Sequence, residues 1–193
     1  MKWNVAISAC CVALLAVNIA LIHQNRQLKA QLALPPLTFE APAGVQVPDL
    51  HGRDLNGQRL EVLYGKDPRK VLVLVFSPTC PFCDQNWPKW QQIILALDRS
   101  SVRPVAVDVT GKADRLFLSQ HQLTGFPVFT EVDPRAVVDY RFHLTPQTIL
   151  IDHGGKVEKV WTGVLNDSAV SELQHLLGGN MTVSDLHNNH PAF

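Results

Sequence analysis

Two cysteines separated by two residues directly follow the most strand-like apolar segment of this chain. That segment, KVLVLVF at residues 70–76, is a continuous run of β-branched and apolar side chains. Such a run is typical of a central strand that is buried on both faces. After Cys80 and Cys83, the apolar side chains between Trp90 and Leu97 recur with helical spacing. We therefore expect Cys80 to lie where a buried strand gives way to a helix.

The remaining sequence predicts strands that alternate with helices. Asn56–Gly57 marks a hairpin turn within residues 45–63, and an antiparallel pair is expected at residues 147–152 and 156–163. Between them we expect strands at 103–109 and 126–132, helices at 113–120 and from Pro134, and a last helix that is capped by Asn166 or Asp167 and ends before Gly178. Parallel strands joined by helices and closed by an antiparallel pair predict an α/β fold, with a mixed central sheet and helices on both faces.

An uncharged apolar segment precedes this domain. Residues 3–22 are long enough to span the roughly 30 Å core of a bilayer as a helix. Small residues are not well placed for signal cleavage, so we expect an uncleaved transmembrane helix, with cleavage or lipidation left open. The expected organisation is a cytoplasmic N-terminus at 1–2, a transmembrane anchor at 3–22, a linker at 23–36, a domain at 37–178 and a flexible tail at 179–193.

The charge balance argues against an electrostatic partner. Lysine plus arginine equals aspartate plus glutamate, at 17 each, so the chain has no net field that attracts nucleic acid. No Gly-rich phosphate loop is present in the sequence either. We expect no nucleic-acid partner.

The position of the two cysteines predicts their chemistry. Exposed N–H groups and the aligned peptide dipoles at a helix N-terminus lower the pKa of a thiol, which favours Cys80 as the nucleophile. Cys83 lies one turn further along, where it can attack a mixed disulfide formed on Cys80. Pro81 suits the first helical turn, because its missing N–H has no partner to lose there.

Other roles of the pair fit the sequence less well. A disulfide between Cys80 and Cys83 closes a very small loop, which makes a poor structural staple. A structural zinc site needs four ligands, and no histidine has the usual spacing to a second cysteine. Two alternatives stay open. One is a Cu(I)-binding metallochaperone, since thiolates suit this ion and His143 is the candidate third ligand. The other is a factor that reduces thiols for metal-site assembly. We expect neither a bound metal nor a cofactor.

Three segments together resemble one family. They are VPDLHGRDLNGQRLEV, VLVLVFSPTCPFCDQNWP and LTPQTILIDHGGKVEKVWTGVL. Over residues 44–177 the chain resembles the TlpA/ResA-like family of membrane-anchored thioredoxin-fold (redoxin) thiol–disulfide oxidoreductases, and SPTCPFC is locally similar to MauD-type proteins. The resemblance implies a thioredoxin-like fold and protein-disulfide reductase activity.

The resemblance also implies a substrate site and a location. Pro146 is expected to be cis and to lie against the dithiol, Thr145 to offer its backbone to an extended peptide, and Pro81 and Phe82 to complete the substrate-binding surface. The implied role is a reductant of protein thiols or disulfides, supplied by a membrane electron donor. It is expected in the cytoplasmic membrane of a bacterium, single-pass, with the domain in the periplasm or extracytoplasmic space.

The chain departs from this family at the positions of its usual acids. Leu74 stands where many thioredoxins carry a buried acid, and Asn86 stands where many TlpA-like proteins carry a glutamate. Asp84 is expected to face solvent, and Asp108 or Glu131 would need a particular geometry to reach the cysteines. The sequence therefore predicts dithiol chemistry without identifying a residue that carries the Cys83 proton.

Overall fold

The computed structural model describes residues 15, 17–22, 24, 41 and 43–178. The chain divides into two units, residues 1–38 and 39–193. In the first unit, the described positions from 15 to 24 are helical. No helix within the described ranges is long and apolar enough to cross a membrane. The predicted N-terminus, most of the predicted anchor and linker, and the tail at 179–193 lie outside the described residues.

The second unit is built on a five-stranded sheet with the strand order β5-β4-β3-β7-β8. The strands are β3 (Lys70–Phe76), β4 (Val102–Asp108), β5 (Val128–Phe129), β7 (Gln147–Ile151) and β8 (Val157–Thr162). Strand β4 is parallel to both β3 and β5, whereas β7 is antiparallel to both β3 and β8. The predicted mixed sheet is confirmed, with its longest apolar strand at the centre.

A smaller sheet has the order β2-β1-β6, formed by β1 (Leu50–Arg53), β2 (Arg59–Val62) and β6 (Glu131–Val132). The prediction of one strand across 126–132 is wrong, because the chain passes from β5 to β6 within that segment and so changes sheet. Gly52 permits this crossing: a Cβ at this position would lie 2.3 Å from the backbone oxygen of Glu131. The sequence pattern could not reveal this, since both halves of the segment are β-like.

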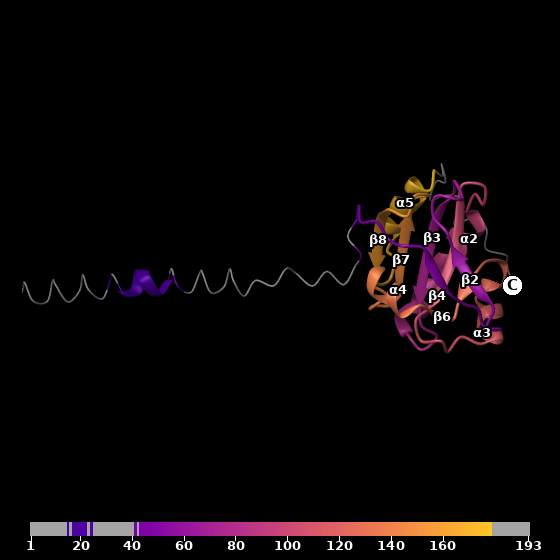
Figure 1. Ribbon diagram of the computed structural model, residues 1–193, viewed down its shortest axis with the longest axis horizontal. Helices are drawn as coiled ribbons and strands as arrows, with labels where there is room; N and C mark the ends of the chain where they lie inside the picture. The colour runs from indigo at the N-terminus through magenta and orange to yellow at the C-terminus, as the bar shows by residue number, and fades with distance from the viewer. Residues whose placement is uncertain (1–14, 16, 23, 25–40, 42, 179–193) are drawn as a thin grey trace, which may run out of the picture. The chain divides into compact units, whose positions relative to one another are not determined.

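Helices cover both faces of the large sheet, as predicted (Figure 1). The helices are α2 (Pro81–Ala96), α3 (Arg115–Gln120), α4 (Pro134–Asp139) and α5 (Asp167–Leu176), with a 3-10 turn η1 (Leu123–Gly125) after α3. Alternate side chains of β3 enter two separate cores. Leu72, Leu74 and Phe76 pack with α2 and α5. The valines at 71, 73 and 75 pack with α4 and the β1–β2 hairpin.

Two local contacts explain why the helices on the dithiol side hold their positions. Trp90 of α2 is 0% exposed, and its indole Nε1 donates to Thr148 Oγ1 of β7 at 2.8 Å. Asn166 caps α5, because its side chain accepts from the backbone N–H of Ala169 at 2.8 Å. The predicted cap is confirmed. Helix α2 is thereby fixed to the sheet from which its own N-terminus emerges.

Candidate active site

The two cysteines lie at the N-terminus of α2, just beyond the end of β3. Cys80 occupies the N-cap position with extended backbone, and Pro81 is the first helical residue. The carbonyl oxygen of Cys80 accepts from the backbone N–H of Cys83 at 3.0 Å. Cys80 is half-buried and Cys83 is fully buried, and both are free thiols. An incoming group can therefore reach Cys80, while Cys83 lies behind it.

The two thiols differ in their proton affinity. Partial burial works against ionisation of Cys80, but hydrogen bonds with the side chains of Thr145 and Cys83, and with the backbone of Cys83 and Phe82, stabilise its thiolate, and the pKa of Cys80 is lowered. Burial is the main reason why the pKa of Cys83 is raised to about 12, and hydrogen bonding and repulsion from Cys80 add to it. The thiolate is the nucleophilic form, so this asymmetry favours attack by Cys80.

The loop before β7 contacts the first cysteine. The Thr145–Pro146 peptide bond is cis, which confirms the geometry that the resemblance implied. The Cys80 sulfur donates to the carbonyl oxygen of Thr145 at 3.5 Å, and Pro146 is buried. The structure therefore brings Cys80, Cys83, Thr145 and Pro146 together at one edge of the sheet.

Three exposed apolar side chains are adjacent in sequence to the dithiol, to the Thr145–Pro146 loop, or to Gly163, whose N–H donates to the carbonyl oxygen of Pro146. Phe82 is 57% exposed, Leu144 is 40% exposed and Val164 is 39% exposed. Pro81 is also exposed. Sequence reasoning singled out Pro81 and Phe82 but missed Leu144 and Val164, because a lone apolar residue in a loop gives no signal of its exposure. These residues are candidates for an apolar contact surface next to the dithiol.

Asn86 connects α2 to the loop that follows β8. Its side chain is 0% exposed. The amide oxygen accepts from the backbone N–H of Leu165 at 2.9 Å, and the amide nitrogen donates to the carbonyl oxygen of Gly163 at 3.4 Å. Gly163 in turn donates its N–H to the carbonyl oxygen of Pro146 at 2.8 Å. Where relatives are expected to carry a titrating acid, this chain has a structural amide.

We expect Asn86→Ala to destabilise the domain by about 1–3 kcal/mol, because it leaves the buried N–H of Leu165 and the half-buried carbonyl oxygen of Gly163 without their partner. The measurement is the free energy of unfolding from urea titrations. Asn56→Ala is the matched control, since the side chain of Asn56 is exposed and its hydrogen bond is to the exposed Arg115. The control should change the free energy of unfolding by less than about 0.5 kcal/mol. Equal losses in the two variants would contradict the stabilising role of this Asn86 tether, which is the pair of hydrogen bonds from its side chain to Leu165 and Gly163.

The three acids considered from sequence lie in different surroundings. Asp84 and Glu131 are exposed. Asp108 ends β4, is 1% exposed and lies opposite Phe76 in the strand register. Of these, only Asp108 is a buried carboxylate at the edge of the sheet from which the dithiol segment emerges.

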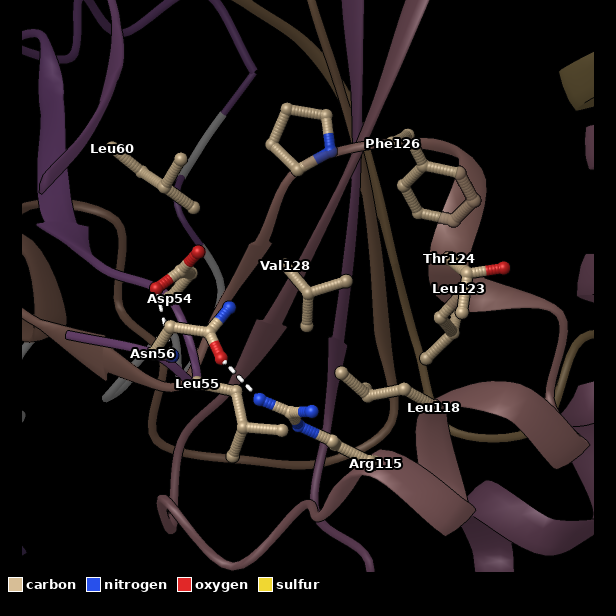
Figure 2. Close-up of a pocket in the computed structure, with 11 residues that line it drawn as sticks. Asp54, Leu55, Asn56, Leu60, Arg115, Leu118, Leu123, Thr124, Phe126 and Val128 are labelled. Carbon is tan, nitrogen blue, oxygen red and sulfur yellow. Dashed lines mark hydrogen bonds between the residues drawn. The ribbon is translucent and has the colours of Figure 1, made fainter. Parts of the chain in front are cut away.

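A cavity of about 360 Å³ lies away from the dithiol, between the β1–β2 turn, α3 and the segment before β5. Figure 2 shows the Arg115 guanidinium hydrogen bonded to the Asn56 side chain, with the apolar side chains of Leu118 and Val128 nearby in the lining. None of the six residues predicted for the site lines this cavity. Among the described residues, no group of three or more His, Cys, Asp or Glu side chains could hold a metal ion.

Comparison with known proteins gives both a family and a fold. A family model described as the AhpC/TSA family matches residues 43–160. Two curated relatives are each called thiol-disulfide oxidoreductase ResA. The one from Bacillus subtilis is 28% identical over 138 residues, covering 69% of this chain and 75% of the relative. The one from Halalkalibacterium halodurans is 26% identical over 141 residues, covering 71% and 78%.

The structural neighbours confirm the expected thioredoxin-like fold. A structure described as the thiol:disulfide interchange protein DsbE from Chlorobium tepidum aligns with a TM-score of 0.58 and 23% identity, covering 72% of this chain and 98% of that chain. At this identity the match establishes the fold alone. The dithiol segment and the cis-Pro146 loop both fall inside the residues that the family model matches.

Proposed function

This chain belongs to the AhpC/TSA family and is a thiol–disulfide oxidoreductase, and we propose that Cys80 and Cys83 carry out its exchange reaction on protein substrates. The observation that carries the proposal is the asymmetry of the pair. One thiol is accessible and has a lowered pKa, and the other is buried directly behind it with a raised pKa.

The proposed reaction has two steps. The Cys80 thiolate attacks one sulfur of a substrate disulfide, forms a mixed disulfide and releases the other substrate sulfur as a thiolate. Cys83 then loses its proton to water and attacks the Cys80 sulfur. This step forms the Cys80–Cys83 disulfide and releases the second substrate thiolate. The substrate disulfide gains two electrons, and the enzyme dithiol loses two.

The surroundings of the dithiol support an extended polypeptide as the substrate. Phe82, Leu144 and Val164 offer apolar surface to side chains that flank a substrate cysteine. The Thr145 carbonyl faces the Cys80 sulfur, where the backbone of a bound peptide would pass. We assign Thr145, Pro146, Pro81 and Phe82 to substrate binding on this basis.

We extend the proposal to the direction of the reaction and to the location of the protein. The resemblance to TlpA/ResA-like proteins supports a reductant, which must be reduced again by a membrane electron donor. The uncharged segment at 3–22 supports a single-pass anchor in the cytoplasmic membrane of a bacterium, with the domain on the extracytoplasmic side.

The reduction potential of the Cys80–Cys83 pair tests the direction. The chain is equilibrated with dithiothreitol or glutathione buffers, free thiols are trapped, and the trapped fraction at Cys80 and Cys83 is measured by peptide mass spectrometry, which separates it from Cys10 and Cys11. We expect a potential below about −230 mV, nearer to thioredoxin than to the strong oxidants. A potential near about −120 mV would make the protein an oxidant. If the two cysteines form no disulfide in any buffer, the exchange reaction itself is wrong, and Cu(I) titration becomes the next experiment.

A further inference from the structure

Ser77 contacts both cysteines through its backbone. Its carbonyl oxygen accepts from the N–H of Cys80 at 3.1 Å. Its backbone also interacts with the Cys83 thiol, an interaction that works against the rise in the pKa of Cys83. Ser77 is also almost fully buried, at 6% exposure. A small movement of this residue would therefore change the surroundings of both sulfurs at once.

The Ser77 side chain belongs to a chain of hydroxyl groups that ends on a carboxylate. Thr110 Oγ1 lies 2.7 Å from Asp108 Oδ1, and Ser77 Oγ lies 3.5 Å from Thr110 Oγ1. A carboxylate only accepts, so Thr110 donates to Asp108 and is left to accept from Ser77. Ser77 Oγ then accepts from Thr79, whose N–H lies at 3.3 Å and whose hydroxyl lies at 3.1 Å. Because the carboxylate oxygen can only accept, it fixes which hydroxyl donates in each of the three hydroxyl bonds.

Asp108 itself is held rigidly. Its carboxylate accepts from the backbone N–H of Thr110 at 2.9 Å and from that of Ala113 at 2.7 Å. The next residue, Val109, donates its N–H to the carbonyl oxygen of Phe76 at 3.1 Å. The end of β4 is thus fixed to the end of β3, immediately before Ser77.

We propose that Asp108 is a positioning residue for the dithiol, which acts through the hydroxyls of Thr110 and Ser77 to hold the Ser77 backbone against the Cys83 thiol. The inference rests on the proposed function, because it concerns the second step, in which Cys83 displaces the substrate from Cys80. This backbone interaction stabilises the thiolate that Cys83 must form. Loss of the hydroxyl chain therefore slows the second step more than the first.

The two steps can be observed separately with the aromatic disulfide dithiobis(nitrobenzoate). Attack by Cys80 releases one coloured thiolate and leaves a mixed disulfide, and attack by Cys83 releases the second. The full chain also contains Cys10 and Cys11, so both are replaced by serine throughout and only the dithiol reacts. In this reduced background, in detergent micelles, we expect Thr110→Val to slow the second release about three- to tenfold, the usual scale for one hydrogen bond. The first release should change by less than about twofold.

Thr110→Ser is the matched control, because it restores the hydroxyl and should restore the second release. Ser77→Ala should slow this release to a similar extent. The double variant Ser77→Ala/Thr110→Val should be no slower than either single variant, since both interrupt one chain. A merely structural role of Thr110 would change thermal stability without this selective effect on one step.

The outcomes separate the inference from the proposed function. An unchanged second release in Thr110→Val, or an equal slowing in Thr110→Ser, would overturn the role of Asp108 and leave the dithiol reaction standing. If the chain with Cys10→Ser and Cys11→Ser but an otherwise unchanged sequence releases only one equivalent, the dithiol reaction is overturned, and the inference with it.

Discussion

Cys80→Ser should lower the rate of disulfide reduction by on the order of a thousandfold or more, as expected when a nucleophile is removed. A serine hydroxyl cannot form the mixed disulfide, and buried Cys83 cannot replace it because its pKa is raised to about 12. The measurement is reduction of a peptide disulfide by the pre-reduced protein under single-turnover conditions. Residual turnover within about tenfold of wild type would show that Cys83, or a residue outside the dithiol, makes the first attack.

Cys83→Ser is the control, because its hydroxyl keeps a hydrogen-bond donor beside Cys80. We expect this variant to carry out the first step and then to stop as a stable mixed disulfide, which mass spectrometry detects. The pKa of Cys80 is lowered, so the thiolate forms at a lower pH than for an ordinary cysteine. The rate of the first step should therefore rise with pH and level off below about pH 8.5. A plateau above that value would contradict the assigned roles.

Trp90→Ala should lower the free energy of unfolding by about 3–5 kcal/mol, the usual cost of truncating a buried tryptophan. Trp90 is fully buried between α2 and the sheet, and the change also leaves Thr148 Oγ1 without its donor. Guanidinium unfolding followed by circular dichroism gives this free energy. Because Trp90 lies on the helix that carries the dithiol, the same variant should also reduce activity.

Leu95→Ala is the matched control on the same helix, since Leu95 is 77% exposed. We expect it to change the free energy of unfolding by less than about 0.5 kcal/mol. Trp90→Phe should fall between the two, because it keeps an aromatic ring but loses the indole N–H. Similar losses in Trp90→Ala and Leu95→Ala would mean that α2 does not depend on its buried face.

Much of the fold follows from local sequence signals. The apolar run at 70–76, the helical spacing after Cys83 and the Asn56–Gly57 turn correspond to β3, α2 and the β1–β2 hairpin. These signals are visible because each element contains its own periodicity. The change of sheet between β5 and β6 has no such signal, since it depends on the close approach that Gly52 permits.

The site likewise has one part that local sequence predicts and another that depends on contacts between distant residues. The position of Cys80 at a helix N-terminus follows from residues within one turn of it. The contacts of Asn86 with Gly163, and of Ser77 with Thr110, join residues that are far apart in the chain. From the sequence, Asn86 is distinctive only because it replaces an acid, and Asp108 is only an acid that needs a particular geometry to reach the cysteines. The partner of Ser77 becomes visible once the strand order places β4 beside β3, and the partners of Asn86 become visible once the loop after β8 is placed beside α2.

The Asn86 tether also bears on the thermodynamics of binding. Through Gly163 it holds the backbone beside cis-Pro146 in place before any partner arrives. A peptide that docks there loses its own conformational freedom but demands little ordering of the protein, and preorganisation of this kind strengthens association. Association should therefore be limited by encounter and by the fit of the peptide. Discrimination between partners then depends on how well their side chains fit the apolar side chains of Phe82, Leu144 and Val164.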